Sequence, residues 1–182
     1  GIYTYGIVSA RDKTAGEVAV DGQPSVFYST RLVSEFSTLA TDRLGVSAGR
    51  SRVLCPLTGR LNRRPASWPT VQRLIEQTVQ VDPGRKRSGA LPSDVNIFNT
   101  NGSLVEIDSR VNETLHDARF ITLRTYDRQP GTYITRGSLM SSGVSDFDRI
   151  AYRAVMDVAA EVFQAVGEEQ LENYMLTNPA TG

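Results

Sequence analysis

The chain has 182 residues, of which 40% are apolar, enough for one domain with a hydrophobic core. Basic and acidic residues number 20 each, and the resulting zero net charge argues against a domain that binds nucleic acid through a basic surface. No apolar run approaches the ~18 residues of a membrane span, so we expect no membrane insertion. The single cysteine, Cys55, excludes an internal disulfide, and its apolar neighbours predict a buried free thiol.

The charges are divided unevenly along the chain. Residues 1–91 hold 13 basic and 7 acidic residues, a net of +6, and residues 92–182 hold the reverse, a net of −6. Such halves can attract each other between copies, head to tail, or can meet inside one subunit and cancel there. Arginine outnumbers lysine by 18 to 2, and arginine is the better residue for bidentate interface pairs.

The first half of the chain alternates strand-like and helical patterns. Residues 4–10 predict a short strand. Ser29 or Thr30 can cap a helix whose apolar face runs from Leu32 to Leu44 and which Gly45 ends. Residues 51–57 are nearly all apolar and predict a buried strand.

A turn at Thr58-Gly59 then leads into an arginine-rich segment and a second helix. This helix opens at Ser67 or Thr70, and we expect its apolar face to consist of Trp68, Val71, Leu74 and Ile75. Residues 80–94 predict a basic loop that contains Arg85-Lys86-Arg87. Residues 95–98 and 103–107 predict strands around a turn at Asn101-Gly102.

Late in the chain, residues 120–126 and 132–135 predict a hairpin through a turn at Arg128–Gly131, with Tyr126 and Tyr133 close across it. A long helix follows. Ser145 with Asp148 fits a capping box, and Gly167 is a natural stop. We expect its apolar stripe to pack on the sheet; the stripe comprises Phe147, Ile150, Ala151, Ala154, Val155, Val158, Ala159, Val162, Phe163 and Val166.

These elements predict an α/β protein of the α+β kind: a mixed β-sheet with a late hairpin, covered by amphipathic helices. Residues 1–167 would form a single domain, and residues 168–182 a polar tail that is cut short. The charged face of the long helix is either solvated or meets a neighbouring subunit. For the second case, the interface residues we would choose are Arg60, Arg63, Arg64, Arg149, Arg153, Asp157 and Glu161.

The sequence offers little that points to chemistry. His116, the one histidine, lies beside Asp117 and allows a hydrolase hypothesis, although the chain has no G-x-S-x-G elbow. Arg85-Lys86-Arg87 allows a second hypothesis, a virion-associated protein that binds nucleic acid. No His/Cys/Asp cluster has metal-ligand spacing, and no phosphate-binding motif is present, so we expect no cofactor.

Three stretches resemble one protein family. They are SRVLCPLTGRLNRRPASW from Ser51, LHDARFITLRTYDRQPGTYITRGSLM from Leu115, and SDFDRIAYRAVMDVAAEVF from Ser145. Together they resemble the middle of contractile phage tail sheath proteins, in particular a divergent branch found in prophages and phage-like particles. The resemblance covers roughly Ser51 to Val166, and the matching residues are structural, not catalytic.

The resemblance implies a structural subunit, not an enzyme. Sheath subunits stack as rings around a tail tube, and their contraction drives the tube through a cell envelope. The partners would be copies of the chain and the tail tube protein, with no specific nucleic acid. The location would be a virion or phage-like particle assembled in the host cytoplasm. Terminal strands that join neighbouring subunits in such proteins are not evident here, so we expect a central part of the subunit. We also expect reversal of Arg153 to weaken assembly and leave the fold intact.

Overall fold

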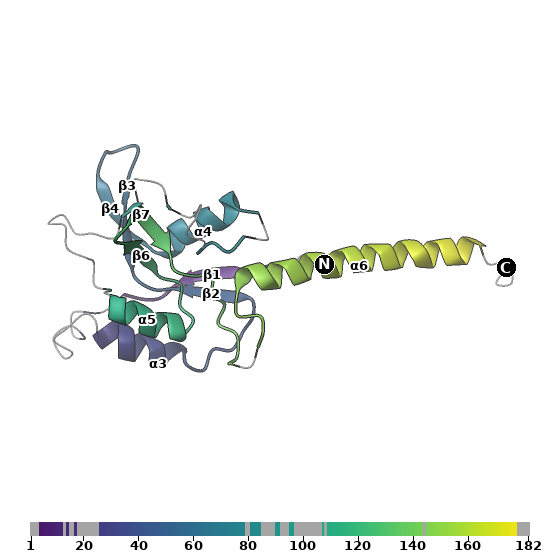
Figure 1. Ribbon diagram of the computed structural model, residues 1–182, viewed down its shortest axis with the longest axis horizontal. Coiled ribbons are helices and arrows are strands. Elements are labelled where there is room, and N and C mark those ends of the chain that lie inside the picture. The colour runs from purple at the N-terminus through teal and green to yellow at the C-terminus, as the bar shows by residue number, and fades with distance from the viewer. Residues whose placement is uncertain are drawn as a thin grey trace.

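A computed structural model describes residues 4–12, 14, 17, 26–78, 81–84, 90–91, 95–96, 107, 109–143 and 145–177. Its elements, in chain order, are β1 (Gly6–Ser9), the π-helical η1 (Phe27–Leu32), α3 (Val33–Phe36), β2 (Leu44–Ser47), β3 (Arg50–Leu54), β4 (Leu61–Pro65), α4 (Ser67–Glu76), β5 (Val95–Asn96), α5 (Ser109–Asp117), β6 (Leu123–Tyr126), β7 (Gln129–Ile134) and α6 (Ile150–Thr177). The α+β class predicted from the sequence is confirmed. All elements but α6 gather into one body, and α6 extends from it (Figure 1).

The centre of the body is a set of short strands that pair both ways. β1 runs parallel to β2, from Gly6 beside Leu44 to Ser9 beside Ser47. A parallel bridge joins Ser47 to Ile121, where the Ile121 amide donates to Val46 at 2.8 Å. The chain continues from there into the antiparallel β6–β7 hairpin. The described strands thus form three small sheets: the parallel pair β1–β2, the antiparallel β4–β3–β5 and the antiparallel pair β6–β7. The Ser47–Ile121 bridge connects the first of them to the segment that enters the third.

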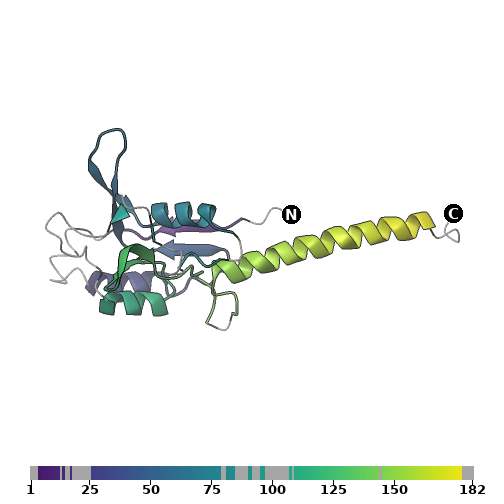
Figure 2. The same cartoon turned by 45° about the horizontal axis from the view of Figure 1, so that its top comes forward.

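Helices lie on both sides of the β1–β2 ladder. α4 lies on one side, and α3 and α5 lie on the other (Figures 1 and 2). On the α3–α5 side a core cluster is built around residues with almost no exposed surface: Phe27, Tyr28, Leu32, Val46, Leu115 and Phe120. A second cluster contains Ala66, Leu91, Ile121, Leu123, Ile134, Leu139 and Ile150. The predicted covering of the sheet by helices is thus confirmed for these three helices.

The first predicted helix is too long. It begins at Phe27 and ends at Phe36, and Leu44–Ser47 is strand β2 instead. The strand wins because its backbone hydrogen-bonds to β1 and to Ile121, which a helix would forgo. Gly45 belongs to this packing, since a Cβ there would lie 2.8 Å from the Ile7 side chain and 3.1 Å from the carbonyl of Ser138.

The helix predicted after Ser67 is confirmed as α4, but most of its expected apolar face is exposed. Trp68 is 51% exposed and Ile75 is 80% exposed, and the buried residues are Pro69 and Thr70. Only Leu74 of that face packs against the second core cluster. The helical period predicted which residues lie on one side of α4, but not whether the rest of the protein covers that side.

The late hairpin is confirmed, and its turn lies earlier than predicted. Tyr126 pairs with Gln129, so Asp127 and Arg128 form the turn and Pro130-Gly131 belongs to β7. The rings of Tyr126 and Tyr133 lie 5.3 Å apart, edge to face, as expected. The predicted basic segment at residues 85–87, and the predicted turn and strand at residues 101–106, lie outside the described part of the chain.

The core assignment can be tested by comparing two truncations. Phe120→Ala should lower the free energy of unfolding by about 3–5 kcal/mol, because it leaves a cavity in the first cluster. Ile75→Ala should change it by less than about 0.5 kcal/mol, because that side chain is mainly in water. Urea unfolding followed by circular dichroism measures both. Similar losses for the two variants would contradict the burial described above.

Candidate assembly surface

The long helix starts later than its capping box predicts. α6 begins at Ile150, and the residues before it are held as extended chain by the bridge between Ser138 and Arg149. Ser145 Oγ accepts the Phe147 amide at 3.2 Å, and the Asp148 side chain pairs with Arg136. The predicted helix cap at Ser145 is therefore wrong, because Ser145 and Asp148 bond to groups outside α6.

The same helix also passes through its predicted stop. α6 continues across Gly167 to Thr177, so the residues to Thr177 are helical and not a tail. A glycine inside a helix costs about 1 kcal/mol relative to alanine. The strong helix formers on either side, such as Ala165 and Glu168, outweigh that cost.

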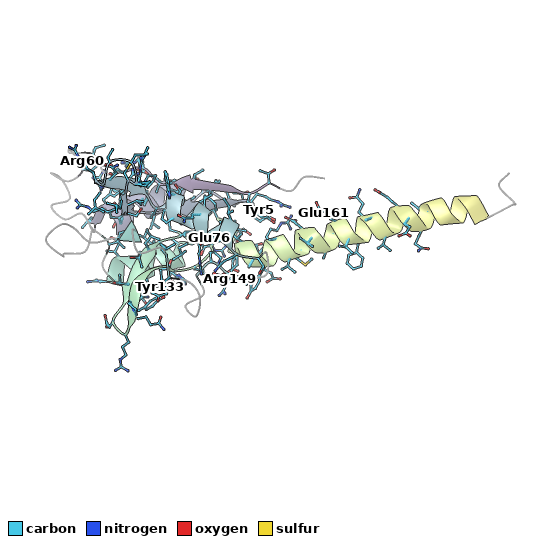
Figure 3. All side chains as sticks on the ribbon, turned by 90° about the horizontal axis from the view of Figure 1, so that it is seen from above. Tyr5, Arg60, Glu76, Tyr133, Arg149 and Glu161 are labelled. Atoms are coloured by element: carbon cyan, nitrogen blue, oxygen red, sulfur yellow. The ribbon has the colours of Figure 1, made fainter. Side chains whose placement is uncertain are left out.

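The apolar stripe of α6 is exposed over most of its length. Ile150 and Ala151 are each 6% exposed and pack into the body. Farther on, the helix has left the body (Figure 3), and large apolar side chains lie in solvent: Val155, Met156, Val158, Val162, Phe163, Val166 and Leu171. Phe163 is 78% exposed. The prediction that the stripe packs on the sheet is therefore wrong beyond Ala151.

The opposite side of the helix faces the body at one buried carboxylate. Asp157 is only 6% exposed. Its Oδ1 accepts a hydrogen bond from Arg43 Nη2 at 2.8 Å, and its Oδ2 accepts from Arg43 Nη1 and from the Tyr5 hydroxyl. Arg153 lies 3.6 Å from Oδ1 and 3.3 Å from Asp42. We call these five residues the helix root.

The helix root corrects two predictions. Arg153 and Asp157 were expected on a face that is solvated or meets another subunit, and both form pairs within the chain. Reversing Arg153 would place a carboxylate beside Asp42 and Asp157, so we now expect it to loosen the root and not to leave the fold intact. Sequence reasoning missed Tyr5 and Arg43, because a contact across 114 residues leaves no local pattern.

Electrostatics at the root favour the charged carboxylate. Burial alone would raise the pKa of Asp157, but hydrogen bonds from Arg43 and Tyr5, with the charges of Arg43 and Arg153, hold that pKa below its ordinary value of 3.8. Burial and the hydrogen bond to Asp157 raise the pKa of Tyr5. The root is therefore a buried carboxylate, Asp157, that is paired with the guanidinium groups of Arg43 and Arg153.

The other predicted interface residues lie at two separate places. Arg149 lies 4.0 Å from Asp82 at the start of α6, and Glu161 is exposed one turn beyond the root. Arg60, Arg63 and Arg64 are exposed on the β3–β4 hairpin, at the other end of the molecule, where Figure 3 labels Arg60. The structure thus brings Arg153 and Asp157 together and leaves the remaining residues in separate groups.

The β3–β4 hairpin projects from the body (Figure 2), and three leucines are exposed near its tip. Leu54 and Leu61 are cross-strand partners, 41% and 49% exposed, and Leu57 in the turn between them is 93% exposed. The strand predicted at 51–57 therefore ends at Leu54 and is not wholly buried. A leucine inside a Pro-x-Thr-Gly turn was the one sequence signal for this exposed tip.

Cys55 in the same turn is half-buried, so the expected buried thiol is wrong. Hydrogen bonds from the Thr58 hydroxyl and from the amides of Thr58 and Leu57 lower the pKa of its thiol.

Two of the hairpin arginines have partners within the chain. Arg63 lies 3.3 Å from Asp12, and the Arg64 guanidinium lies 5.3 Å from the centre of the Trp68 ring.

The hydrolase hypothesis gains no geometry from the structure. His116 Nε2 lies 3.5 Å from Arg136 Nη1, and Asp117 is exposed. No serine is among the hydrogen-bond partners recorded for His116 in the described residues. Within the same residues, no group of three or more His, Cys, Asp or Glu side chains is arranged to hold a metal ion.

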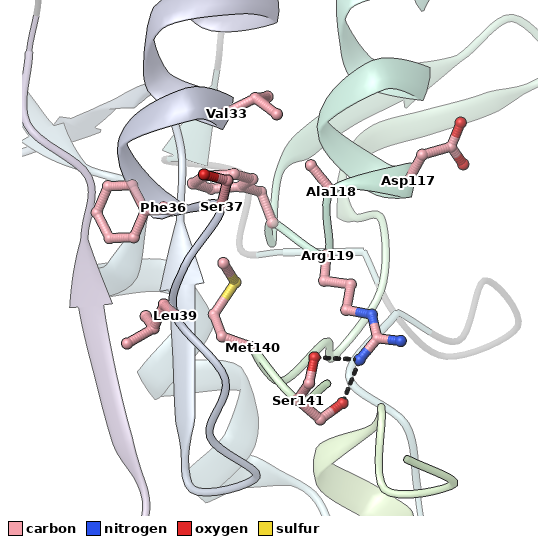
Figure 4. A pocket seen from close by; sticks show the side chains of 10 residues that line it. Val33, Phe36, Ser37, Leu39, Asp117, Ala118, Arg119, Met140 and Ser141 are labelled. Carbon is pink, nitrogen blue, oxygen red and sulfur yellow. Dashed lines mark hydrogen bonds between the residues drawn. The ribbon is translucent and has the colours of Figure 1, made fainter. Parts of the chain in front are cut away.

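Two hollows lie on the body. One, of about 250 Å³, is lined by apolar residues of α3 and by Arg119 and Ser141 (Figure 4). Arg119 has a positive φ of 66° and donates from Nη1 to the Ser141 side chain and carbonyl, so it closes one wall. The other, of about 320 Å³, is mainly apolar and lies between α4 and the start of α6.

The geometry defines an α+β body with two projecting elements that expose apolar side chains, α6 and the β3–β4 hairpin. No helix among the described residues has the length and apolarity to cross a membrane. The chain belongs to the DUF2586 family: residues 10–138 match the family's N-terminal domain. This match covers the body from the end of β1 onward and ends before α6. No curated protein matches the chain.

The helix root makes a prediction about stability and pH. Asp157→Asn keeps the shape but leaves Arg43 and Arg153 without their shared anion, so the free energy of unfolding at pH 7 should fall by about 2 kcal/mol. This is less than for a fully buried pair, because the Arg43 side chain is 27% exposed. Since the folded pKa is lowered, the wild-type advantage is present above pH 3.8 and is lost as pH falls through the folded value.

Urea unfolding of both proteins between pH 2 and pH 7 measures this difference. Glu161→Gln, which removes an exposed carboxylate one turn away, is the control and should change stability by less than about 0.5 kcal/mol. A gap between wild type and Asp157→Asn that widens on acidification would refute the assignment.

Proposed function

We propose that the protein is a structural subunit of a contractile tail sheath, which self-assembles around a tail tube in a virion or phage-like particle. The observation that carries the proposal is the exposed apolar side of α6. A helix that keeps Val158, Val162 and Phe163 in water gains nothing from that arrangement as an isolated molecule. Contiguous apolar surface of this kind is typical of a site where another protein binds.

The helix root supports the same proposal. Because Asp157 is bound on one side of α6, the helix has a fixed direction as it leaves the body, and its apolar side is turned away from that body. A rigid projecting element can transmit a rotation or a shift between subunits, which a loosely tethered one cannot. The resemblance of residues 51–166 to tail sheath proteins supplies the particular assembly.

This function needs no cofactor and no catalytic residue in the chain. Its partners would be further copies and the tail tube protein. A sheath stores its energy as packing between subunits, so the interfaces, and not an active site, would be the functional part of the molecule.

Negative-stain electron microscopy of the purified protein, alone and with a tail tube, tests the proposal. We expect hollow, striated tubes whose diameter fits the tail tube. Phe163→Asp should abolish them, because it places a charge on the apolar side of α6. Leu171→Asp is the matched control: it is 67% exposed on the same helix, about 40° around the axis from Asp157, and should leave the tubes intact.

Failure to form tubes with or without a tail tube, at any ionic strength, would count against a sheath. Equal loss with Phe163→Asp and Leu171→Asp would show that the apolar side has no special part in assembly.

A further inference from the structure

We propose that α6 of one copy docks on the β3–β4 hairpin and the start of α4 of a second copy, in a head-to-tail contact. This inference rests on the proposed self-assembly and names the two surfaces that meet. The arm is α6 beyond the root, residues 158–177, about 30 Å long at 1.5 Å per residue. The receiving surface comprises Leu57, Arg60, Arg64 and Trp68.

The arm has two sides of different character. With 100° per residue, Val155, Val162 and Val166 lie roughly 140–180° around the helix from Asp157, so they face away from the body. Glu161 and Glu168 lie within roughly 40° of Asp157 and continue its polar side beyond the body. Both glutamates are exposed. Val158 and Val162, roughly 100° and 140° from Asp157, lie on the flank between the glutamates and the outward side. A partner that covers this flank meets an apolar contact beside a negative one.

The receiving surface offers apolar and positive side chains. Leu57 in the turn is 93% exposed and Trp68 is 51% exposed. Arg60 and Arg64 are exposed on one face of the hairpin, because side chains alternate along a strand, and Arg64 lies over the Trp68 ring. Leucine, tryptophan and arginine together are a composition that buries apolar surface and pairs with carboxylates in one contact.

The charges are separated along the sequence in a way that fits this pairing. Residues 43–75 contain seven arginines and no acidic residue, and residues 154–177 contain one aspartate, four glutamates and no basic residue. Asp157 is paired with Arg43 inside the chain, whereas Glu161, Glu168 and Glu169 of the arm are exposed. The β3–β4 hairpin of a second copy supplies a positive surface that these glutamates can pair with.

One chain cannot make this contact with itself. α6 leaves the body at one end of the long axis, and the β3–β4 hairpin lies near the other end (Figures 1 and 3). The two surfaces are different, so each copy would use its arm on one neighbour and its hairpin on the next. Such heterologous contacts close into rings or continue as open helices, which are the two geometries of a sheath.

Charge reversal on each side tests the contact. In Arg60→Glu/Arg64→Glu, the receiving surface repels the arm, and in Glu161→Lys/Glu168→Lys, the arm repels the receiving surface. We expect each variant alone to self-associate at least about tenfold more weakly than wild type in sedimentation velocity. An equimolar mixture should recover association, because every arm then finds a surface of opposite charge.

A matched control carries the same change in net charge as Arg60→Glu/Arg64→Glu, but elsewhere on the molecule. Arg110 and Arg128 are exposed on α5 and in the β6–β7 turn, so Arg110→Glu/Arg128→Glu should associate like wild type. Association of the single-side variants at wild-type strength, or a mixture that stays as weak as its components, would overturn the contact. A wild-type protein that stays monomeric at every concentration would also overturn it.

The outcomes separate this inference from the proposed function. Tubes that form normally from Arg60→Glu/Arg64→Glu would leave the sheath proposal standing and remove this contact. Recovery of association on mixing, with chains of subunits but no tubes around a tail tube, would establish the contact and count against the sheath.

Discussion

The arrangement of this molecule depends on one buried carboxylate. Asp157 is held by Arg43 and Tyr5 from the start of the chain and is flanked by Arg153 from its own helix. Desolvating an acid is costly unless it is paired and hydrogen-bonded, and here both conditions are met. The pairing fixes which side of α6 meets the body. The apolar side is consequently turned to solvent.

The same constraint explains the distribution of charge. The basic first half and the acidic second half meet inside one subunit at Arg43 and Asp157. In two other pairs between the halves, Asp42 with Arg153 and Asp82 with Arg149, the first half supplies the acid and the second half the base. These internal pairs therefore do not cancel the difference in net charge between the two halves. The arginines of the β3–β4 hairpin and the glutamates of α6 remain at opposite ends. An unbalanced charge at each end is what a directional assembly requires.

The sequence predicted well where local pattern and packing agree. The β6–β7 hairpin, the contact of Tyr126 with Tyr133, and the strand at Gly6–Ser9 follow from side-chain alternation and turn residues. It failed where a distant partner decides. Leu44 shares the helical period of the segment before it, but it belongs to strand β2, which pairs with β1 and bonds to Ile121. The helical period of α6 was predicted correctly, but its apolar side was expected to be buried and is exposed. No local sequence signal indicates that Arg43 pairs with Asp157 and so brings the polar side of the helix to the body.

The candidate site followed the same rule. Glu161 and the hairpin arginines could be chosen from sequence as surface charges, whereas Leu57 and Trp68 were assigned to buried strand and helix faces. Their exposure depends on how far the hairpin and α4 extend past the core, a property of the whole body.

Hydrogen exchange of the wild-type protein at low and high concentration tests the central claim most directly, that the outward side of α6 binds the hairpin of another copy. The account predicts that amides of residues 158–167 and of residues 54–61 become protected together as concentration rises, while those of α5 do not change. Protection of only one of these segments, or of neither, would contradict it.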